Sequence, residues 1–171
     1  MMKRISHIRS GGQTGADRGA LDAARAAGIP ICGWCPKGGW AEDLPEPPGL
    51  LTDYPELKEA PSADTIQRTE WNVRDSDATL IICPGGLAVS PGTAATARFA
   101  ETYDKPYLVV EDASEGALEQ VRSWLDSLET PIELNIAGPR ESESPGTYVA
   151  TYAIIEHLVL PETIQPHTSD I

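Results

Sequence analysis

The chain is poor in the features that mark several large classes of protein. Its 171 residues include three cysteines, one phenylalanine and 13 lysines and arginines, against 26 acidic residues. So few cysteines, and an odd number of them, argue against a disulfide scaffold and fit a reducing cytoplasm. The net charge of −13 argues against nucleic-acid and anionic-membrane partners. It leaves room for one small anionic ligand held by backbone N–H groups.

Long apolar runs are absent as well. No 18-residue apolar stretch is present, which predicts that no helix spans a membrane. The opening run "MMKRISHIRSGG" has basic residues but no apolar region, so no signal peptide is expected and the predicted location is the cytoplasm. Length and composition predict a single domain over residues 1–160, with a C-terminal tail at 161–171.

Strand-like and helix-like segments alternate along the chain. The expected strands are 3–9, 29–35, 78–84, 105–111 and 131–138, and the expected helices are 16–27, 64–75, 93–103, 114–128 and 147–160. Residues 36–60 are rich in proline, glycine and acid and predict a long ordered loop. The alternation predicts a Rossmann-like three-layer α/β/α fold around a parallel five-stranded sheet. Right-handed crossovers suggest the flavodoxin-like order 2-1-3-4-5. Period two puts Ile5 and His7 on one face of the first strand and Ser6 and Ile8 on the other.

Glycine-rich turns follow four of these strands. They are "SGGQTG" (10–15), "CPKG" (35–38), "PGG" (84–86) continuing to "SPGT" (90–93), and "AGPR" (137–140). Ligands of parallel sheets bind at the carboxyl ends of the strands, where the strand order reverses, here between the first and third predicted strands. One such turn is explained as a tight connection. Two adjacent clusters, each opening a helix, favour a phosphate or nucleotide-like ligand, because glycine lets the backbone approach an anion.

Polar side chains near these turns add candidate contacts. Thr14, Ser90 and Thr93 supply hydroxyl donors, and we expect the amide of Gln13 to contact the ligand. Asp17 and Arg18 are explained either as helix-start electrostatics or as a contact across an oligomer interface. The tryptophans fit an interface or a core equally; they are Trp34, Trp40, Trp71 and Trp124.

The helix before the third strand offers two further candidates. Its N-terminal part points toward the ligand edge of the sheet, which favours Arg68 and Thr69 as ligand contacts. Glu70 and Arg74 have the i,i+4 spacing of an exposed ion pair.

Metal and nucleophile motifs are weak. Cys32 and Cys35 form a CxxC pair, but no second pair or histidine cluster completes a zinc site, so no metal site is predicted. Cys83 lies near the end of the third strand and is explained as a buried thiol, and ligand contact is left open for all three cysteines. No Ser-His-Asp set is visible, and the three histidines, His7, His157 and His167, have no ligand spacing.

Taken in order, the motifs resemble a known family. "SGGQTGADRGALDAA", "GWCPKGGWAED", "RTEWNVRDSDATLII", "SPGTAATARFA" and "LNIAGPRES" are similar to the cpYpsA-related branch of the SLOG superfamily, which includes molybdenum cofactor carrier proteins. The resemblance implies a Rossmann-like fold, a pocket for a nucleotide-like or pterin ligand, and a homo-oligomer, either a dimer or a tetramer. For the carriers, that ligand is molybdenum cofactor, a pterin phosphate, which implies handover of this cargo to molybdoenzymes.

The resemblance also assigns residues to the pocket. The ligand-binding set carried over motif by motif is Gly11, Gly12, Gln13, Thr14, Gly15, Lys37, Arg68, Thr69, Gly85, Gly86, Ser90, Gly92 and Thr93. Gly138 and Arg140 join it from "AGPRES", at the pocket or at a subunit contact.

Two other functions stay open beside the carrier. SLOG relatives include Lonely-Guy-type nucleotide phosphoribohydrolases, whose motif resembles PGGxGTxxE and whose glutamate does acid–base work. Here Thr96 stands where that glutamate is expected, and a threonine hydroxyl is no base at neutral pH. Glu42, Asp43 or Glu101 would have to substitute, and nothing in the sequence places them. The hypothesis is therefore a non-enzymatic carrier or store. A nucleotide-sensing module is the third reading.

Overall fold

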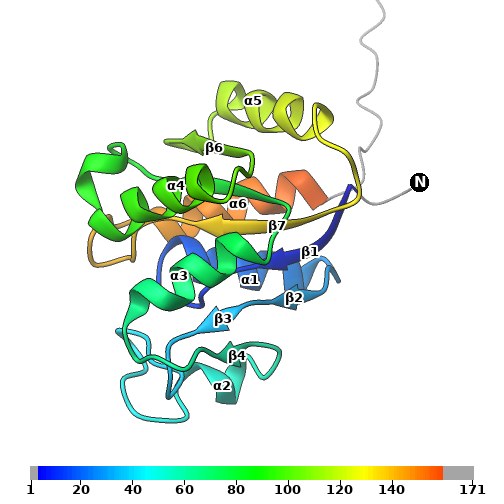
Figure 1. Cartoon of the computed structure of the whole chain (residues 1–171). Helices are drawn as coiled ribbons and strands as arrows, with labels where there is room; N and C mark the ends of the chain where they lie inside the picture. Colours follow the sequence, from blue (N-terminus) through cyan, green and yellow to red (C-terminus); the bar gives the residue numbers. More distant parts are fainter. Residues whose placement is uncertain (1–3, 160–171) are drawn as a thin grey trace, which may run out of the picture.

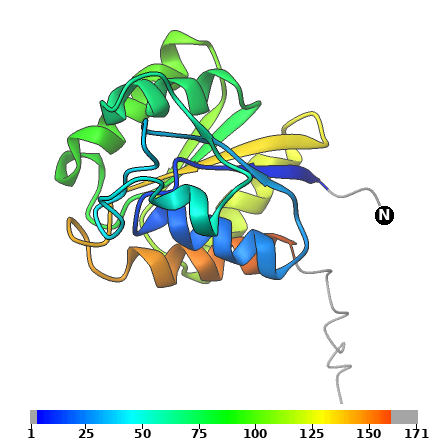
Figure 2. The ribbon, with the colours of Figure 1, turned by 90° about the horizontal axis from the view of Figure 1, so that it is seen from below.

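The computed structural model describes residues 4–159 and has three layers (Figure 1). Five parallel strands form the central sheet: β1 (Ile5–Arg9), β2 (Ile31–Cys32), β5 (Ala78–Ile82), β6 (Tyr107–Val110) and β7 (Ile132–Ala137). One face is covered by α1 (Ala16–Ala26), α5 (Glu115–Asp126) and α6 (Thr147–Val159), and the other by α3 (Thr65–Arg74) and α4 (Pro91–Thr102), as Figure 2 shows. The predicted Rossmann-like α/β/α class is confirmed.

The predicted strand order is wrong. The observed order is β2-β1-β7-β5-β6, so the last strand lies in the middle of the sheet and pairs with both β1 and β5. Burial explains this position, because β7 buries four of its six residues, whereas β6 at the edge buries only Val110. A strand that is apolar on both faces is stable where helices cover both sides.

The observed order is a rearranged Rossmann order. Counting from β7 as the first strand, the sheet reads 3-2-1-4-5, the arrangement of the Rossmann half-sheet. The reversal of strand order therefore lies between β7 and β5, and not between β1 and β5 as the sequence suggested.

Two strands depart from simple periodicity. In β1 a register shift between Ile5 and His7 lets both Ile5 and Ile8 be buried, which corrects the predicted period-two pattern. The predicted strand 29–35 is broken at Gly33, which has φ 149° and whose added Cβ would lie 1.9 Å from the Ser10 carbonyl oxygen. After the break, β3 (Trp34–Cys35) pairs with β4 (Lys58–Glu59) in a separate two-stranded sheet.

The segment 36–60 is ordered, as expected, but it is not all loop. It contains the short helix α2 (Leu50–Asp53) and β4, and its Leu50 and Leu57 are buried. A Cβ at Gly12 would lie 2.8 Å from a Leu50 methyl carbon, so this segment packs directly on the first glycine turn.

The helices begin and end within two residues of their predicted bounds. Side-chain caps explain three starts, since Asp64, Ser90 and Ser114 each accept a backbone N–H from the first turn of their helix. A short 3-10 helix, η1 (Leu87–Val89), precedes α4. The predicted tail 161–171 lies outside the described residues.

The predicted Glu70–Arg74 ion pair is wrong. Arg74 instead pairs with Asp75, with Nε 2.8 Å from Oδ1, and Glu70 accepts a 2.7 Å hydrogen bond from the Tyr103 hydroxyl at the end of α4. Because α3 packs on α4, Glu70 bonds to a residue at the end of α4 and not to Arg74 on its own helix. Within residues 4–159, no helix has the length and apolarity needed to cross a membrane.

Candidate functional site

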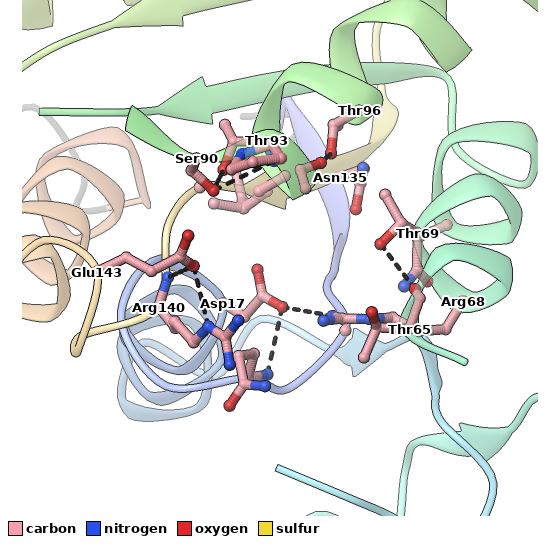
Figure 3. A pocket seen from close by; sticks show the side chains of 18 of the residues that line it. Asp17, Thr65, Arg68, Thr69, Ser90, Thr93, Thr96, Asn135, Arg140 and Glu143 are labelled. Carbon is pink, nitrogen blue, oxygen red and sulfur yellow. Dashed lines mark hydrogen bonds and ion pairs between the residues drawn. The ribbon is translucent and has the colours of Figure 1, made fainter. Parts of the chain in front are cut away.

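A cavity of about 350 Å³ opens at the carboxyl ends of β7 and β5, where the strand order reverses (Figure 3). Its size lies within the range of small-molecule sites. Five parts of the fold meet there: the turn after β1 with the start of α1, the segment at Trp40, the end of β7 with its following turn, the start of α4, and α3. The lining residues used below are Gly11, Gln13, Asp17, Trp40, Arg68, Thr69, Ser90, Gly92, Thr93, Thr96, Asn135, Gly138, Arg140 and Glu143.

The start of α4 presents hydrogen-bond donors to the cavity. Ser90 caps the helix, since its Oγ accepts the Thr93 N–H at 3.3 Å and the Thr93 hydroxyl at 2.8 Å. Because Ser90 Oγ is the acceptor in both hydrogen bonds, its own hydroxyl proton stays available to a ligand. Pro91 has no N–H to donate. The Gly92 N–H, also in the first turn of α4, has no partner in the described part of the chain. The positive end of the helix dipole lies at the same place.

A buried ion pair forms the opposite wall. The Arg68 guanidinium lies 2.8 Å from Oδ2 of Asp17, and the two side chains are 12% and 7% exposed. The same oxygen accepts the Gln13 N–H at 3.2 Å. Burial raises the pKa of the Asp17 carboxyl, although Arg68 acts in the opposite direction.

Gly11 makes room for this pair. A Cβ at residue 11 would lie 1.7 Å from an Arg68 nitrogen, so the glycine is required by the path of the guanidinium. Arg68 Nε is buried and has no hydrogen-bond partner among residues 4–159.

A second, more exposed pair lies at the rim. Arg140 Nε is 3.0 Å from Glu143 Oε1, and the guanidinium is also 3.8 Å from Glu42. The Arg140 side chain is partly exposed, so this pair can open more readily than the Asp17–Arg68 pair.

The structure brings about half of the predicted pocket residues together. Those lining the cavity are Gly11, Gln13, Arg68, Thr69, Ser90, Gly92 and Thr93, with Gly138 and Arg140 beside them. They come from three turns and one helix, and Figure 3 shows that Arg68, Thr69, Ser90 and Thr93 lie around one open space.

The other predicted residues are placed elsewhere. Gly12 packs on Leu50, and a Cβ at Gly15 would lie 2.3 Å from the Pro139 carbonyl oxygen. The remaining four also lie off the lining: Thr14 bonds to Glu42, the Lys37 backbone N–H bonds to Ser62, Gly85 faces Val89, and Gly86 faces Glu111. The four glycines among them shape the turns, because each has a positive φ that glycine adopts without strain.

Gln13 has a structural task that the sequence did not reveal. Its Oε1 accepts the N–H groups of Thr14 and Glu42, both at 3.0 Å. Arg18 binds Asp43 through two hydrogen bonds of 2.8 and 2.9 Å, which explains this arginine within one chain. Together these bonds hold the segment 40–43, and they carry Trp40 to the cavity.

Several lining residues were missed, among them Asp17, Trp40, Thr96, Asn135 and Glu143. Asn135 is the most informative, because it is the polar residue among the four buried positions of β7 and is only 2% exposed. Its Nδ2 donates to Thr79 Oγ1 at 3.2 Å. The polar interruption in "IELNIA" was a usable signal, but only the central position of β7 brings it to the site.

The cysteines lie away from the cavity lining. Burial raises the pKa of Cys32 to about 12 and that of Cys35 to about 11, so both thiols stay protonated at neutral pH. Cys83 is buried and its Sγ lies 2.9 Å from the Gly86 carbonyl oxygen. Over the described range, no cluster of three or more His, Cys, Asp or Glu residues could hold a metal ion.

Comparisons with known proteins agree with this architecture. Residues 8–159 match the family model described as "Circularly permutated YpsA SLOG family". No curated protein matches the chain. Among solved structures, the chain is similar to the crystal structure of a "Putative molybdenum carrier protein" from Syntrophus aciditrophicus SB. The two share 44% identity over 92% of this chain and 97% of that chain, with a TM-score of 0.82. The central position of the last strand, β7, agrees with a circular permutation, and the chain belongs to the circularly permutated YpsA SLOG family.

Proposed function

We propose that this protein binds and carries a small anionic organic ligand. The ligand is either molybdenum cofactor, which is a pterin phosphate, or a related nucleotide-like molecule. The observation that carries the proposal is the start of α4, where the Ser90 hydroxyl, the Gly92 N–H and the helix dipole converge on one cavity. Such helix starts are suited to phosphate groups. The similarity to a solved protein described as a "Putative molybdenum carrier protein" supports the same role.

The charges of the lining are compatible with an anion in an acidic protein. Arg68 and Arg140 are balanced formally by Asp17 and Glu143, so attraction to the ligand comes mainly from oriented N–H and O–H groups. These donors act at short range, whereas the more distant charges that contribute to the net charge of −13 are largely screened by salt.

We propose that the carrier binds its ligand without catalysing a reaction on it. The Thr96 hydroxyl donates to the Gly92 carbonyl at 3.2 Å, an interaction within its own helix, and it is no base at neutral pH. Glu42 and Asp43 are bound to Thr14 and Arg18, and neither lines the cavity. The two carboxylates of the lining, Asp17 and Glu143, are each held by an arginine. We therefore expect no release of free base from AMP.

Calorimetry on the purified protein tests the proposal. Molybdenum cofactor and guanosine 5′-monophosphate (GMP) are the probes, and Ser90→Ala is expected to weaken binding of whichever binds by about 10-fold, since one hydrogen bond to a charged group is lost. Ser114→Ala is the matched control, because Ser114 caps α5 in the same way but lies away from the cavity.

Two results would overturn the proposal: neither probe binds, or the Ser90→Ala and Ser114→Ala variants bind equally well. Free base released from AMP would replace the carrier with the hydrolase. A dimer or tetramer, and handover of the cargo to molybdoenzymes, belong to the same proposal. Light scattering of the purified chain tests the first of these, and reconstitution of a cofactor-free molybdoenzyme by loaded protein tests the second.

A further inference from the structure

Two buried side chains of the cavity wall, Asp17 and Asn135, each have one acceptor oxygen without a donor among residues 4–159. Asp17 uses Oδ2 for Arg68 and the Gln13 N–H, and in Figure 3 its other carboxylate oxygen points into the open space. Ser10 lies near, but its single hydroxyl proton goes to the Ile136 carbonyl at 3.1 Å. Asn135 donates its Nδ2 to Thr79, and its Oδ1 has no partner among residues 4–159. Both side chains are more than nine-tenths buried.

We propose that Asp17 and Asn135 recognise N–H donors on the ring of the ligand, so that the cavity selects a ring with such donors over a bare oxyanion. This inference rests on the proposed function and adds the chemistry of the part of the ligand beyond its anionic group. Buried polar groups built to bond a ligand discriminate strongly, because a ligand without the matching group leaves them unpaired.

A bare oxyanion does not match this wall. Phosphate and molybdate near neutral pH present mainly oxygen acceptors, and here they would face a carboxylate oxygen and an amide carbonyl. The donors at Ser90 and Gly92 suit the anionic group, whereas Asp17 and Asn135 suit a part of the ligand that donates.

Trp40 favours a ring over sugar hydroxyls as that donating part. It is the one aromatic side chain among the described residues that line the cavity. The segment that contains Trp40 is held in place by the hydrogen bond from the Glu42 N–H to Gln13 and by the Arg18–Asp43 ion pair. A flat ring can therefore stack on a positioned indole while its edge bonds to the acceptors. The amino-oxopyrimidine edge, which guanine and pterin rings share, has adjacent N–H donors of this kind.

Asp17→Asn is the central test, because it keeps the volume and turns the free acceptor atom into a donor, although it also removes the negative charge that pairs with Arg68. The Arg68 guanidinium and the Gln13 N–H both require an acceptor, so they hold the new amide oxygen where Oδ2 was. The amide nitrogen then replaces the free oxygen and turns an acceptor into a donor. Asn135→Leu independently removes the second acceptor. Asp126→Asn is the matched control, since Asp126 is 55% exposed, pairs with Arg4 and does not line the cavity.

Calorimetric titrations use GMP, inosine 5′-monophosphate, 6-carboxypterin, ribose 5-phosphate and molybdate. We expect GMP or 6-carboxypterin to bind at least about 10-fold more tightly than ribose 5-phosphate and molybdate. GMP is expected to bind more tightly than inosine 5′-monophosphate, which lacks the 2-amino donor. The two ring probes distinguish a nucleotide from a pterin source. Asp17→Asn and Asn135→Leu are each expected to lose about 10-fold or more of the ring-probe affinity, while Asp126→Asn keeps it.

The inference is overturned if ribose 5-phosphate or molybdate binds as tightly as both ring probes, or if the folded Asp17→Asn and Asn135→Leu variants bind them like the unchanged protein. Thermal melts establish folding, and either variant alone decides the matter if the other does not fold. If all anions bind equally and Ser90→Ala weakens them all, the proposed function stands and this inference fails. If no probe binds, molybdenum cofactor included, both fail.

Discussion

Replacing Arg68 by methionine is expected to cost the protein much of its stability near neutral pH. The change keeps most of the side-chain volume but removes the cation 2.8 Å from Asp17, whose side chain is 7% exposed. Breaking a buried pair by removing one partner costs about 3–5 kcal/mol, because the remaining charge stays buried and uncompensated. The cavity beside Asp17 admits water, so we expect the lower end, about 3 kcal/mol.

The pH dependence identifies the cause. Burial already raises the pKa of Asp17 above its ordinary value, and Arg68 is the largest opposing influence. Without Arg68 the folded-state pKa rises further, so the folded variant binds the proton more tightly than the unfolded chain does. The stability of the variant is then highest at acid pH, falls as pH rises from the unfolded pKa to the folded pKa, and is constant above it.

Urea unfolding at several pH values between 5 and 8 measures this effect. The deficit of Arg68→Met relative to the unchanged protein should shrink toward pH 5, and Asp17→Asn combined with Arg68→Met should recover part of the loss, because no buried charge remains. A loss below about 1 kcal/mol at pH 7, or one independent of pH and of the residue at 17, would refute the reasoning.

Three further predictions concern other parts of the fold. Gly33→Ala should destabilise the protein by about 2 kcal/mol or more in urea, since its Cβ would meet the Ser10 carbonyl at a φ of 149°, whereas Gly116→Ala in open space on α5 should be neutral or slightly stabilising. Cys32 and Cys35, with pKa values of about 12 and 11, should react with iodoacetamide at pH 8 far more slowly than in urea, and equal rates would contradict their burial. Gln13→Ala should loosen the Trp40 segment and weaken ligand binding about 10-fold with little change in global stability, as hydrogen exchange of residues 40–43 would reveal.

Much of the fold could be predicted from local pattern. The alternation of strand and helix, the caps at Ser90 and Ser114, and the buried run at 78–82 each depend on neighbours in the chain, so periodicity and capping chemistry suffice to find them. The expected grouping of the "SGGQTG" and "SPGT" turns at one sheet edge follows from the parallel arrangement alone.

The sequence could not place β7. Its apolar residues indicate a strand covered on both faces, but hydrophobicity does not say which strands lie beside it, and sequential order suggested the edge. The misplaced strand moved the expected reversal point, and so Asn135 was missed.

The sequence by itself determined a parallel α/β protein and pointed to a helix start that we propose binds an anion, because helix caps and glycine turns depend on residues close together in the chain. Only the tertiary structure decided which polar groups meet. Asp17 and Arg68 are 51 positions apart, and Gln13 binds the backbone of Glu42. Residue 11 must be glycine because the Arg68 guanidinium of α3 occupies the space of a side chain there. Such long-range contacts depend on how elements pack, and no pattern within one segment contains them.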